Sequence, residues 1–136
     1  MVQKIFKPKG WLIGAGAIHA IMGIGVQTVM PEDVAKMGWG DAVAAHDVFY
    51  ETLMAFFIIP HVAVMFAAAF MLSGIHQARI TAVLGGSMLV NFVAAAIHAG
   101  SASYMAEMGS AEAFAPPIIL FLGVTLSGVL NWNNDG

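Results

Sequence analysis

Residues 53–72 read LMAFFIIPHVAVMFAAAFML, an apolar run in which His61 is the single ionisable side chain. A bilayer core takes about 20 helical residues to cross, so this stretch alone is long enough for one span. Three further stretches have the same character, and the run at 53–72 extends back as helix to about residue 42. The sequence therefore predicts an all-α integral membrane protein, a single domain over residues 1–136 with four transmembrane helices at about 11–30, 42–73, 78–99 and 116–132.

The composition supports a membrane protein and excludes several other classes. The chain has 136 residues, of which 60% are apolar and 10% charged, and its mean hydropathy is +0.83. Soluble domains carry about a quarter charged residues, so these charges are too few to cover a water-facing surface. Disorder is excluded as well, because it needs low hydrophobicity and high charge. The net charge of −3 does not indicate the basic surface that nucleic-acid binding needs. The absence of cysteine excludes disulfides and thiolate metal sites.

Basic residues predict the orientation of the helices. Lys4, Lys7 and Lys9 precede the first helix and Arg79 lies at the turn between the second and third, whereas only Lys36 lies on the other side. Because Lys and Arg favour cytoplasmic loops, we expect both termini in the cytoplasm, which is consistent with four spans. We also expect the first apolar stretch to be a retained helix rather than a cleaved signal peptide, since it lacks a small-x-small cleavage site.

Short connections make consecutive helices neighbours, so the simplest packing is an antiparallel four-helix bundle. Helices in lipid associate through small residues that let their backbones approach. Such residues recur at a spacing of four in Gly10 and Gly14, Gly16 and Ala20, and Gly123 and Ser127. Helix packing is the favoured interpretation of these pairs.

Three polar side chains are predicted near the middle of the membrane: His19 on the first helix, His61 on the second and Asn91 on the third. Ionisable groups cost about 2.5–3.5 kcal/mol each at that depth on insertion scales, so they are default candidates for a site. His19 and His61 suit the two axial ligands of a b-type haem. Together with Asn91 they equally suit a quinone or another flat hydrophobic ligand. The alternative is that each histidine is neutral and makes a structural hydrogen bond to the backbone or to Asn91.

A second polar group is predicted at the outer boundary, away from the lysines, and consists of His46, Asp47, Glu51 and His98. Imidazole and carboxylate suit zinc or iron, so one hypothesis is a divalent metal site formed by these four residues. Another is catalysis, with Glu51 and His98 as a general acid/base pair. The alternative to both is a structural hydrogen bond at the membrane edge. His76, in the predicted cytoplasmic turn, is expected only to be solvated.

The run WLIGAGAIHAIMG at residues 11–23, which opens a four-span chain, resembles small bacterial four-helix membrane proteins of the broad DoxX-like group. The resemblance covers the helix count and this one motif. It implies a location in the bacterial inner membrane and an accessory role in a quinone-coupled redox complex. His19 is carried over as a matching position, without an assigned role.

Three functions remain open on these residues. The first is a small membrane protein that binds haem, quinone or another flat hydrophobe between its first three helices, as a subunit of a membrane redox complex. The second is a non-catalytic accessory subunit whose small-residue faces contact other membrane subunits or a second copy of the chain. The third is a membrane enzyme that uses Glu51 and His98 on a lipid-like substrate. In all three the surrounding partner is membrane lipid.

Overall fold

The fold is known from a computed structural model, which describes residues 5–106 and 108–133. All regular structure in these two ranges is helical. Four helical stretches are long and apolar enough to cross a membrane: Pro8–Val29, Ala45–Met71, Gly74–Ala102 and Ala111–Leu130. The predicted all-helical class and the four candidate spans are therefore confirmed. Large apolar side chains such as Ile21, Phe56 and Ile97 are exposed along the spans, as contact with lipid requires.

The first span is built from three consecutive segments, α2 (Pro8–Ile18), a π-helix η1 (His19–Val26) and α3 (Gln27–Val29). Pro8 lies in the first turn of α2, where its missing N–H has no intrahelical partner to lose. The wider π turns begin at His19, one of the predicted site residues. Such turns are rare and often occur at functional sites. Hydropathy does not distinguish π-helical from α-helical hydrogen bonding, so the sequence predicted an uninterrupted helix.

The predicted connection after the first span is itself a helix, α4 (Pro31–Trp39), followed by the single turn η2 (Gly40–Ala42). Pro31 occupies the first turn, where Glu32 and Asp33 also suit the positive end of the helix dipole. Gly40 ends the helix with a positive φ of 68°, which glycine adopts without steric cost. The sequence predicted only a connection here, since the segment is too short and too polar to register as a span.

The second span, α5 (Ala45–Met71), begins three residues later than predicted. The Asp47 carboxylate accepts a hydrogen bond of 2.8 Å from the Ala44 N–H and so fixes the start of the helix. The third span, α6 (Gly74–Ala102), follows after the two residues Leu72 and Ser73. The buried Gln77 side chain closes this turn, because its Nε2 donates to the carbonyls of Ala68, Ala69 and Leu72 at 3.0, 3.1 and 2.8 Å.

The fourth span, α7 (Ser110–Leu130), corrects the predicted position of two prolines. A helix that begins at about residue 116, as predicted, would place Pro116 and Pro117 in its first turn, but they lie inside the helix. The preceding residues 111–115 are mostly alanine with one glutamate, both strong helix formers, and they extend the helix towards its N-terminus. Gly109, with a φ of 86°, marks the break before it.

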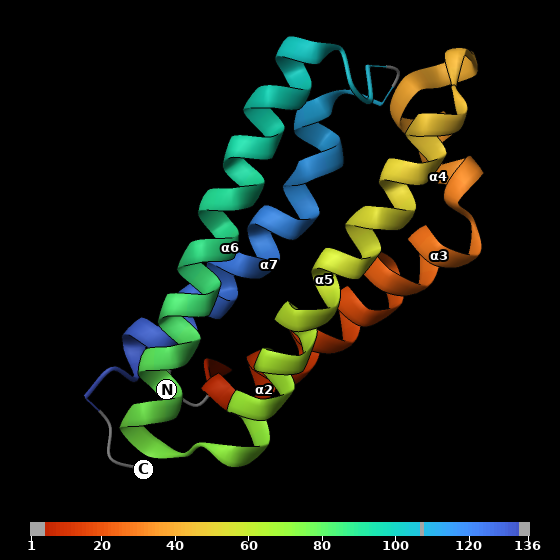
Figure 1. The fold of residues 1–136 in the computed structure, drawn as a ribbon. Coiled ribbons are helices and arrows are strands. Elements are labelled where there is room, and N and C mark those ends of the chain that lie inside the picture. Colours follow the sequence, from red (N-terminus) through yellow and green to blue (C-terminus); the bar gives the residue numbers. More distant parts are fainter. Residues whose placement is uncertain (1–4, 107, 134–136) are drawn as a thin grey trace.

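The four spans pack as two hairpins rather than as an even bundle. One hairpin joins the first span to α5, and the other joins α6 to α7 (Figure 1). Within the second hairpin the backbones approach closely, since a Cβ on Gly85 would overlap Thr125 and one on Gly128 would overlap Ala82. The hairpins meet along α2 and α7, where the buried core consists of Leu12, Ala15, Met65, Ala68, Ala69, Met88, Phe121 and Val124. The expected contact between consecutive spans therefore holds within each hairpin and is sparse between α5 and α6.

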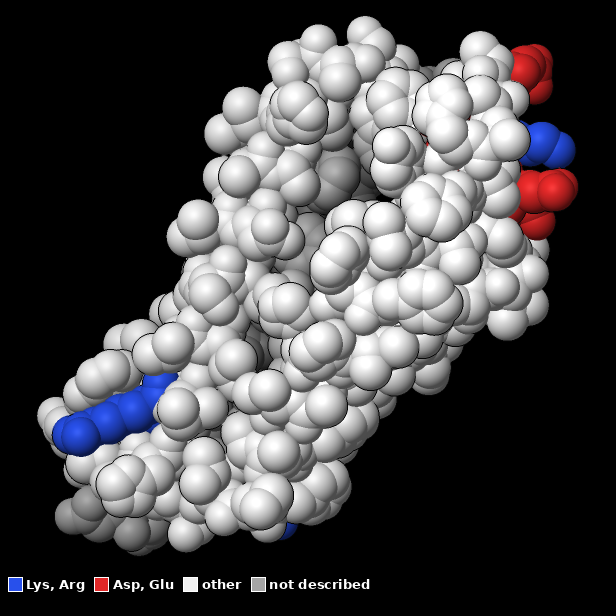
Figure 2. All heavy atoms as spheres, in the orientation of Figure 1, with Lys and Arg blue, Asp and Glu red and all other residues white. Residues whose placement is uncertain are grey.

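The two ends of the molecule differ in charge. At the end where α2 and α6 begin, Lys9 lies over the Phe70 ring at 5.6 Å and Arg79 over the Trp132 ring at 5.5 Å. At the opposite end the charged atoms gather over α4, and Figure 2 shows an uncharged band between the two groups. We call these the basic end and the α4 end. Lys4 lies outside the described residues, and the cytoplasmic location of the basic end stays a prediction.

Candidate functional site

A cavity of about 760 Å³ lies between the two hairpins. The hairpins separate towards the α4 end, and the space-filling view is hollowed along this line (Figures 1 and 2). Small-molecule sites occupy about 300–1,000 Å³, so the cavity is large enough for an organic ligand. Its walls include all five residues predicted to bind a cofactor or to catalyse: His19, Glu51, His61, Asn91 and His98. We describe its two ends in turn.

His19 forms the inner end of the cavity and has a buried nitrogen without a partner. Its side chain is 7% exposed and lies edge-on to the rings of Phe92 and Phe121, with centroid distances of 5.8 and 4.9 Å. The Nε2 atom is buried and makes no hydrogen bond to any described residue. A buried polar atom left unpaired costs about 1–3 kcal/mol. This position therefore favours a ligand atom that pairs with the imidazole.

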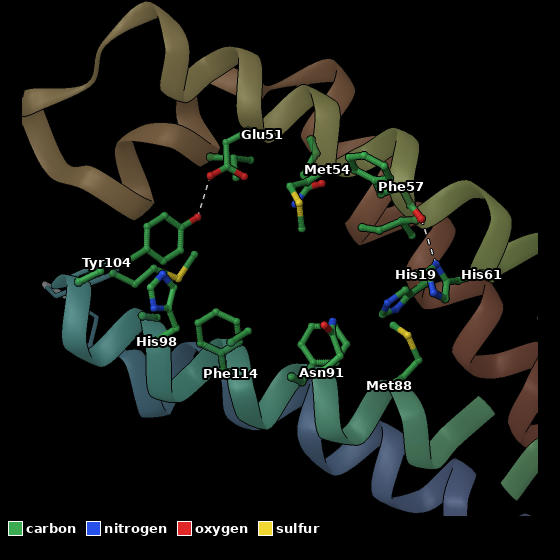
Figure 3. A pocket seen from close by; sticks show the side chains of 18 of the residues that line it. His19, Glu51, Met54, Phe57, His61, Met88, Asn91, His98, Tyr104 and Phe114 are labelled. Atoms are coloured by element: carbon green, nitrogen blue, oxygen red, sulfur yellow. Dashed lines mark hydrogen bonds between the residues drawn. The ribbon is translucent and has the colours of Figure 1, made fainter. Parts of the chain in front are cut away.

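His61 comes from α5, and its ring lies near that of His19 in the same cavity (Figure 3). Its Nδ1 is 3.0 Å from the Phe57 carbonyl oxygen. Because a carbonyl only accepts, Nδ1 must carry the proton and donate, which leaves Nε2 as the free nitrogen. Histidines that ligate metals commonly have the second ring nitrogen held in this way.

Two amides line the same cavity. Asn91 lies on α6, across the cavity from Met54 on α5 (Figure 3). Gln27, at the start of α3, has a buried Oε1 without a hydrogen-bond partner among the described residues. Gln27 was not among the residues predicted from the sequence, although an amide near the end of an apolar span was a signal that pointed to it. The structural hydrogen bond proposed between a histidine and Asn91 is not present among the described residues, whereas His61 bonds the backbone.

The α4 end of the cavity is organised around Glu51, which is 8% exposed. Tyr104 donates its hydroxyl proton to Glu51 Oε1 at 2.7 Å, and this bond joins α5 to the chain that follows α6. Burial raises the pKa of the Tyr104 phenol above its ordinary value, and the hydrogen bond and negative charge of Glu51 raise it further. The phenol therefore stays protonated and acts as a donor.

Residues 103–105 present Tyr104 to the opposite hairpin. Ser103 and Met105 have positive φ angles of 57° and 56°, a conformation that costs a non-glycine residue about 1–3 kcal/mol. The Met105 N–H donates to the Gly38 carbonyl at 2.7 Å, and the Tyr104 ring lies edge-on to Trp39 at 5.0 Å. A Cβ on Gly38 would overlap the Tyr104 ring. These residues lie outside the four predicted spans, and hydropathy does not reveal the contacts of residues between spans.

The four residues predicted as a metal site are not brought together. His46 pairs with Asp47, with 3.3 Å between Nε2 and Oδ1, and the Asp47 carboxylate also caps α5. Neither lines the cavity. Glu51 and His98 do line it, from α5 and α6, and Tyr104 lies between them in Figure 3. In the described ranges 5–106 and 108–133 no group of three His, Asp or Glu residues is placed to hold a metal ion.

Comparison with known proteins assigns no family to the chain. No family model, curated protein or solved structure matches it significantly. The resemblance of residues 11–23 to the DoxX-like group therefore stays a prediction.

Proposed function

We propose that the protein binds a flat, lipid-soluble molecule of the quinone or b-type haem class in the cavity between its hairpins, as a subunit of a membrane redox complex. The observation that carries this proposal is the buried and unpaired Nε2 of His19, in a cavity that the His61 ring also lines. This cavity has a volume of about 760 Å³ and mostly apolar walls. A ligand with a polar group at this point satisfies His19 and leaves its apolar surface against Phe92 and Met88.

Each ligand class uses the two imidazoles differently. A quinone oxygen accepts a hydrogen bond from an imidazole N–H or from the Asn91 amide, and a quinol hydroxyl donates to His61 Nε2. A haem iron takes an imidazole nitrogen as an axial ligand. The Phe57 carbonyl holds the His61 ring with Nε2 free, which suits either role.

The test is to purify the full chain from membranes in a mild detergent and identify what it carries. We expect either a Soret band whose α and β bands sharpen on dithionite reduction, or a quinone recovered by organic extraction. His61→Ala should lose most of that ligand. His76→Ala removes an exposed histidine at the start of α6, away from the cavity, and should keep it. Equal ligand content in His61→Ala and the parent would overturn the proposal.

A chain that is purified empty is tested by adding the ligand back. Haemin and a short-chain quinone are titrated separately, and binding is followed by absorption and by quenching of tryptophan fluorescence. Saturable binding that His61→Ala weakens supports the proposal. If neither haemin nor the quinone binds the parent protein, the proposal is wrong.

A second candidate is the accessory role, with contact to another membrane subunit or to a second copy. The observation that favours it is on α2, where a Cβ on Gly10 or Gly14 would have no atom of this chain's described residues within 4 Å. These two glycines therefore do not mediate the packing predicted for them inside the fold. Cysteine crosslinking from position 14 in native membranes tests this role, and a chain that stays uncrosslinked and runs as a lone monomer counts against it.

A further inference from the structure

We propose that the α4 end of the cavity is a second binding site, selective for lipophilic organic cations, with Glu51 as the counter-ion. The Glu51 carboxylate is 8% exposed and borders an apolar cavity. Within the described part of the chain, no Lys, Arg or His nitrogen lies within 4.0 Å of its oxygens. A buried carboxylate without a countercharge is costly, so this position favours an occupant that supplies positive charge.

The hydrogen bond from Tyr104 does not supply that charge. The phenol donates one proton at 2.7 Å and is itself neutral, and burial with the neighbouring carboxylate raises its pKa. The second oxygen of Glu51, Oε2, has no hydrogen-bond partner among the described residues, and Glu51 lines the cavity. Lys36, the single basic residue of α4, is exposed and does not line the cavity.

The walls around Glu51 favour an organic cation over a metal ion. The aromatic rings of Trp39, Tyr104 and Phe114 line the cavity, and the Tyr104 ring, which bonds Glu51, lies edge-on to Trp39 at 5.0 Å. Cations are attracted to the faces of such rings, and desolvated alkyl or aryl ammonium groups benefit most. A metal ion needs several oxygen or nitrogen ligands, and in residues 5–106 and 108–133 no group of three acidic or histidine side chains is placed to provide them.

This site is separate from the one at His19 and His61. Glu51 and His61 lie ten residues apart on α5, which corresponds to about 15 Å along a helix. A cation paired with Glu51 therefore does not need either imidazole. The two proposals fail independently: His61→Ala should keep the cation, and Glu51→Gln should keep the flat ligand.

The test uses two probes of the same shape and opposite charge, tetraphenylphosphonium and tetraphenylborate. Their binding to the full chain in a non-ionic detergent is measured by equilibrium dialysis, with protein-free micelles subtracted. We expect saturable binding of the phosphonium and none of the borate. Glu51→Gln should weaken phosphonium binding about tenfold or more. The matched control Glu32→Gln removes the same charge from an exposed position on α4 and should leave binding unchanged.

A second variant keeps the proposal testable if Glu51→Gln does not fold. Trp39 lines the cavity and is 42% exposed, so Trp39→Leu is tolerated more easily. It should weaken phosphonium binding about two- to fivefold, as the loss of one exposed cation–π contact predicts. Equal binding by the parent and a folded Glu51→Gln, or saturable binding of the borate with similar affinity, would overturn the assignment. So would an unchanged affinity in Trp39→Leu where that is the variant that folds.

Discussion

The hydrogen bond between Tyr104 and Glu51 joins the two hairpins at the α4 end, and its energy is measurable with a double-mutant cycle. Tyr104→Phe removes only the hydroxyl, and Glu51→Met removes both carboxylate oxygens while it keeps a side chain of similar length. Hydrogen bonds to a charged group contribute about 1.5–3 kcal/mol. Glu51 is 8% exposed and the bond is 2.7 Å long, so solvent screening is small and we expect a coupling energy in that range.

Single variants alone do not isolate this energy. Tyr104→Phe also leaves a buried carboxylate unpaired, and Glu51→Met also removes a buried charge. The cycle subtracts these effects, because the coupling is the amount by which the double variant departs from the sum of the two singles. The free energy of unfolding is measured for all four proteins in detergent micelles by titration with a denaturing detergent, followed by circular dichroism.

A control cycle combines Tyr104→Phe with Asp47→Asn. Asp47 lies on the same helix end as Glu51, but its carboxylate bonds the Ala44 N–H and pairs with His46 instead of Tyr104. Its coupling to Tyr104 should lie within about 0.5 kcal/mol of zero. A Tyr104–Glu51 coupling equally close to zero would refute the reasoning that this bond holds the hairpins together.

Three other predictions concern stability and protonation. Gly38→Ala should destabilise the fold by about 1–3 kcal/mol, since the new Cβ overlaps the Tyr104 ring. Gly14→Ala has open space around the new Cβ, so it should be neutral or stabilise the fold by up to about 1 kcal/mol. Unfolding titrations of both variants check these opposite effects. Gln77→Leu should cost about 1–3 kcal/mol in the same assay, because the last carbonyls of α5 lose their donor. In a Tyr50→Phe background, the ultraviolet absorbance of the phenolate should show that the pKa of Tyr104 lies above the ordinary tyrosine value of about 10. Because the pKa of Tyr104 is higher in the folded protein, the protonated phenol contributes to the free energy of unfolding below pH 10, and this contribution is lost as the pH rises above that value. Titration of Tyr104 at the ordinary pKa would contradict the buried bond to Glu51.

Hydropathy was sufficient to predict the four spans, because each needs only an apolar length that matches the bilayer. It was insufficient for the ends of the helices, which depend on local hydrogen bonds. The Asp47 cap, the Gln77 contacts and the helix formers before Pro116 moved those ends by several residues. The polar and amphipathic α4 was missed for a related reason, since it is held by its end charges and by contacts with α5 rather than by apolar length.

The candidate site was predictable where it lies on spans and not where it lies between them. His19, His61 and Asn91 were selected because polar groups in an apolar helix are costly, and the structure places all three around one cavity. The position of Tyr104 depends on left-handed backbone at Ser103 and Met105, which the sequence does not signal. The predicted metal group is not assembled among the described residues, because Asp47 is engaged in its own helix cap.

The turn at Leu72 and Ser73, closed by Gln77, lies at one end of the long helix α5, so a small rotation at this turn displaces the other end of α5 much further. The core and the covalent turn hold the hairpins at the basic end, and the Tyr104 bond holds them at the other. Helix α5 has 27 residues and is therefore about 40 Å long. A rotation of about 5° at the turn displaces its far end by roughly 3–4 Å over that length. A small rotation at the tightly packed end is therefore amplified at the α4 end, where the Tyr104–Glu51 bond is the contact that opposes it.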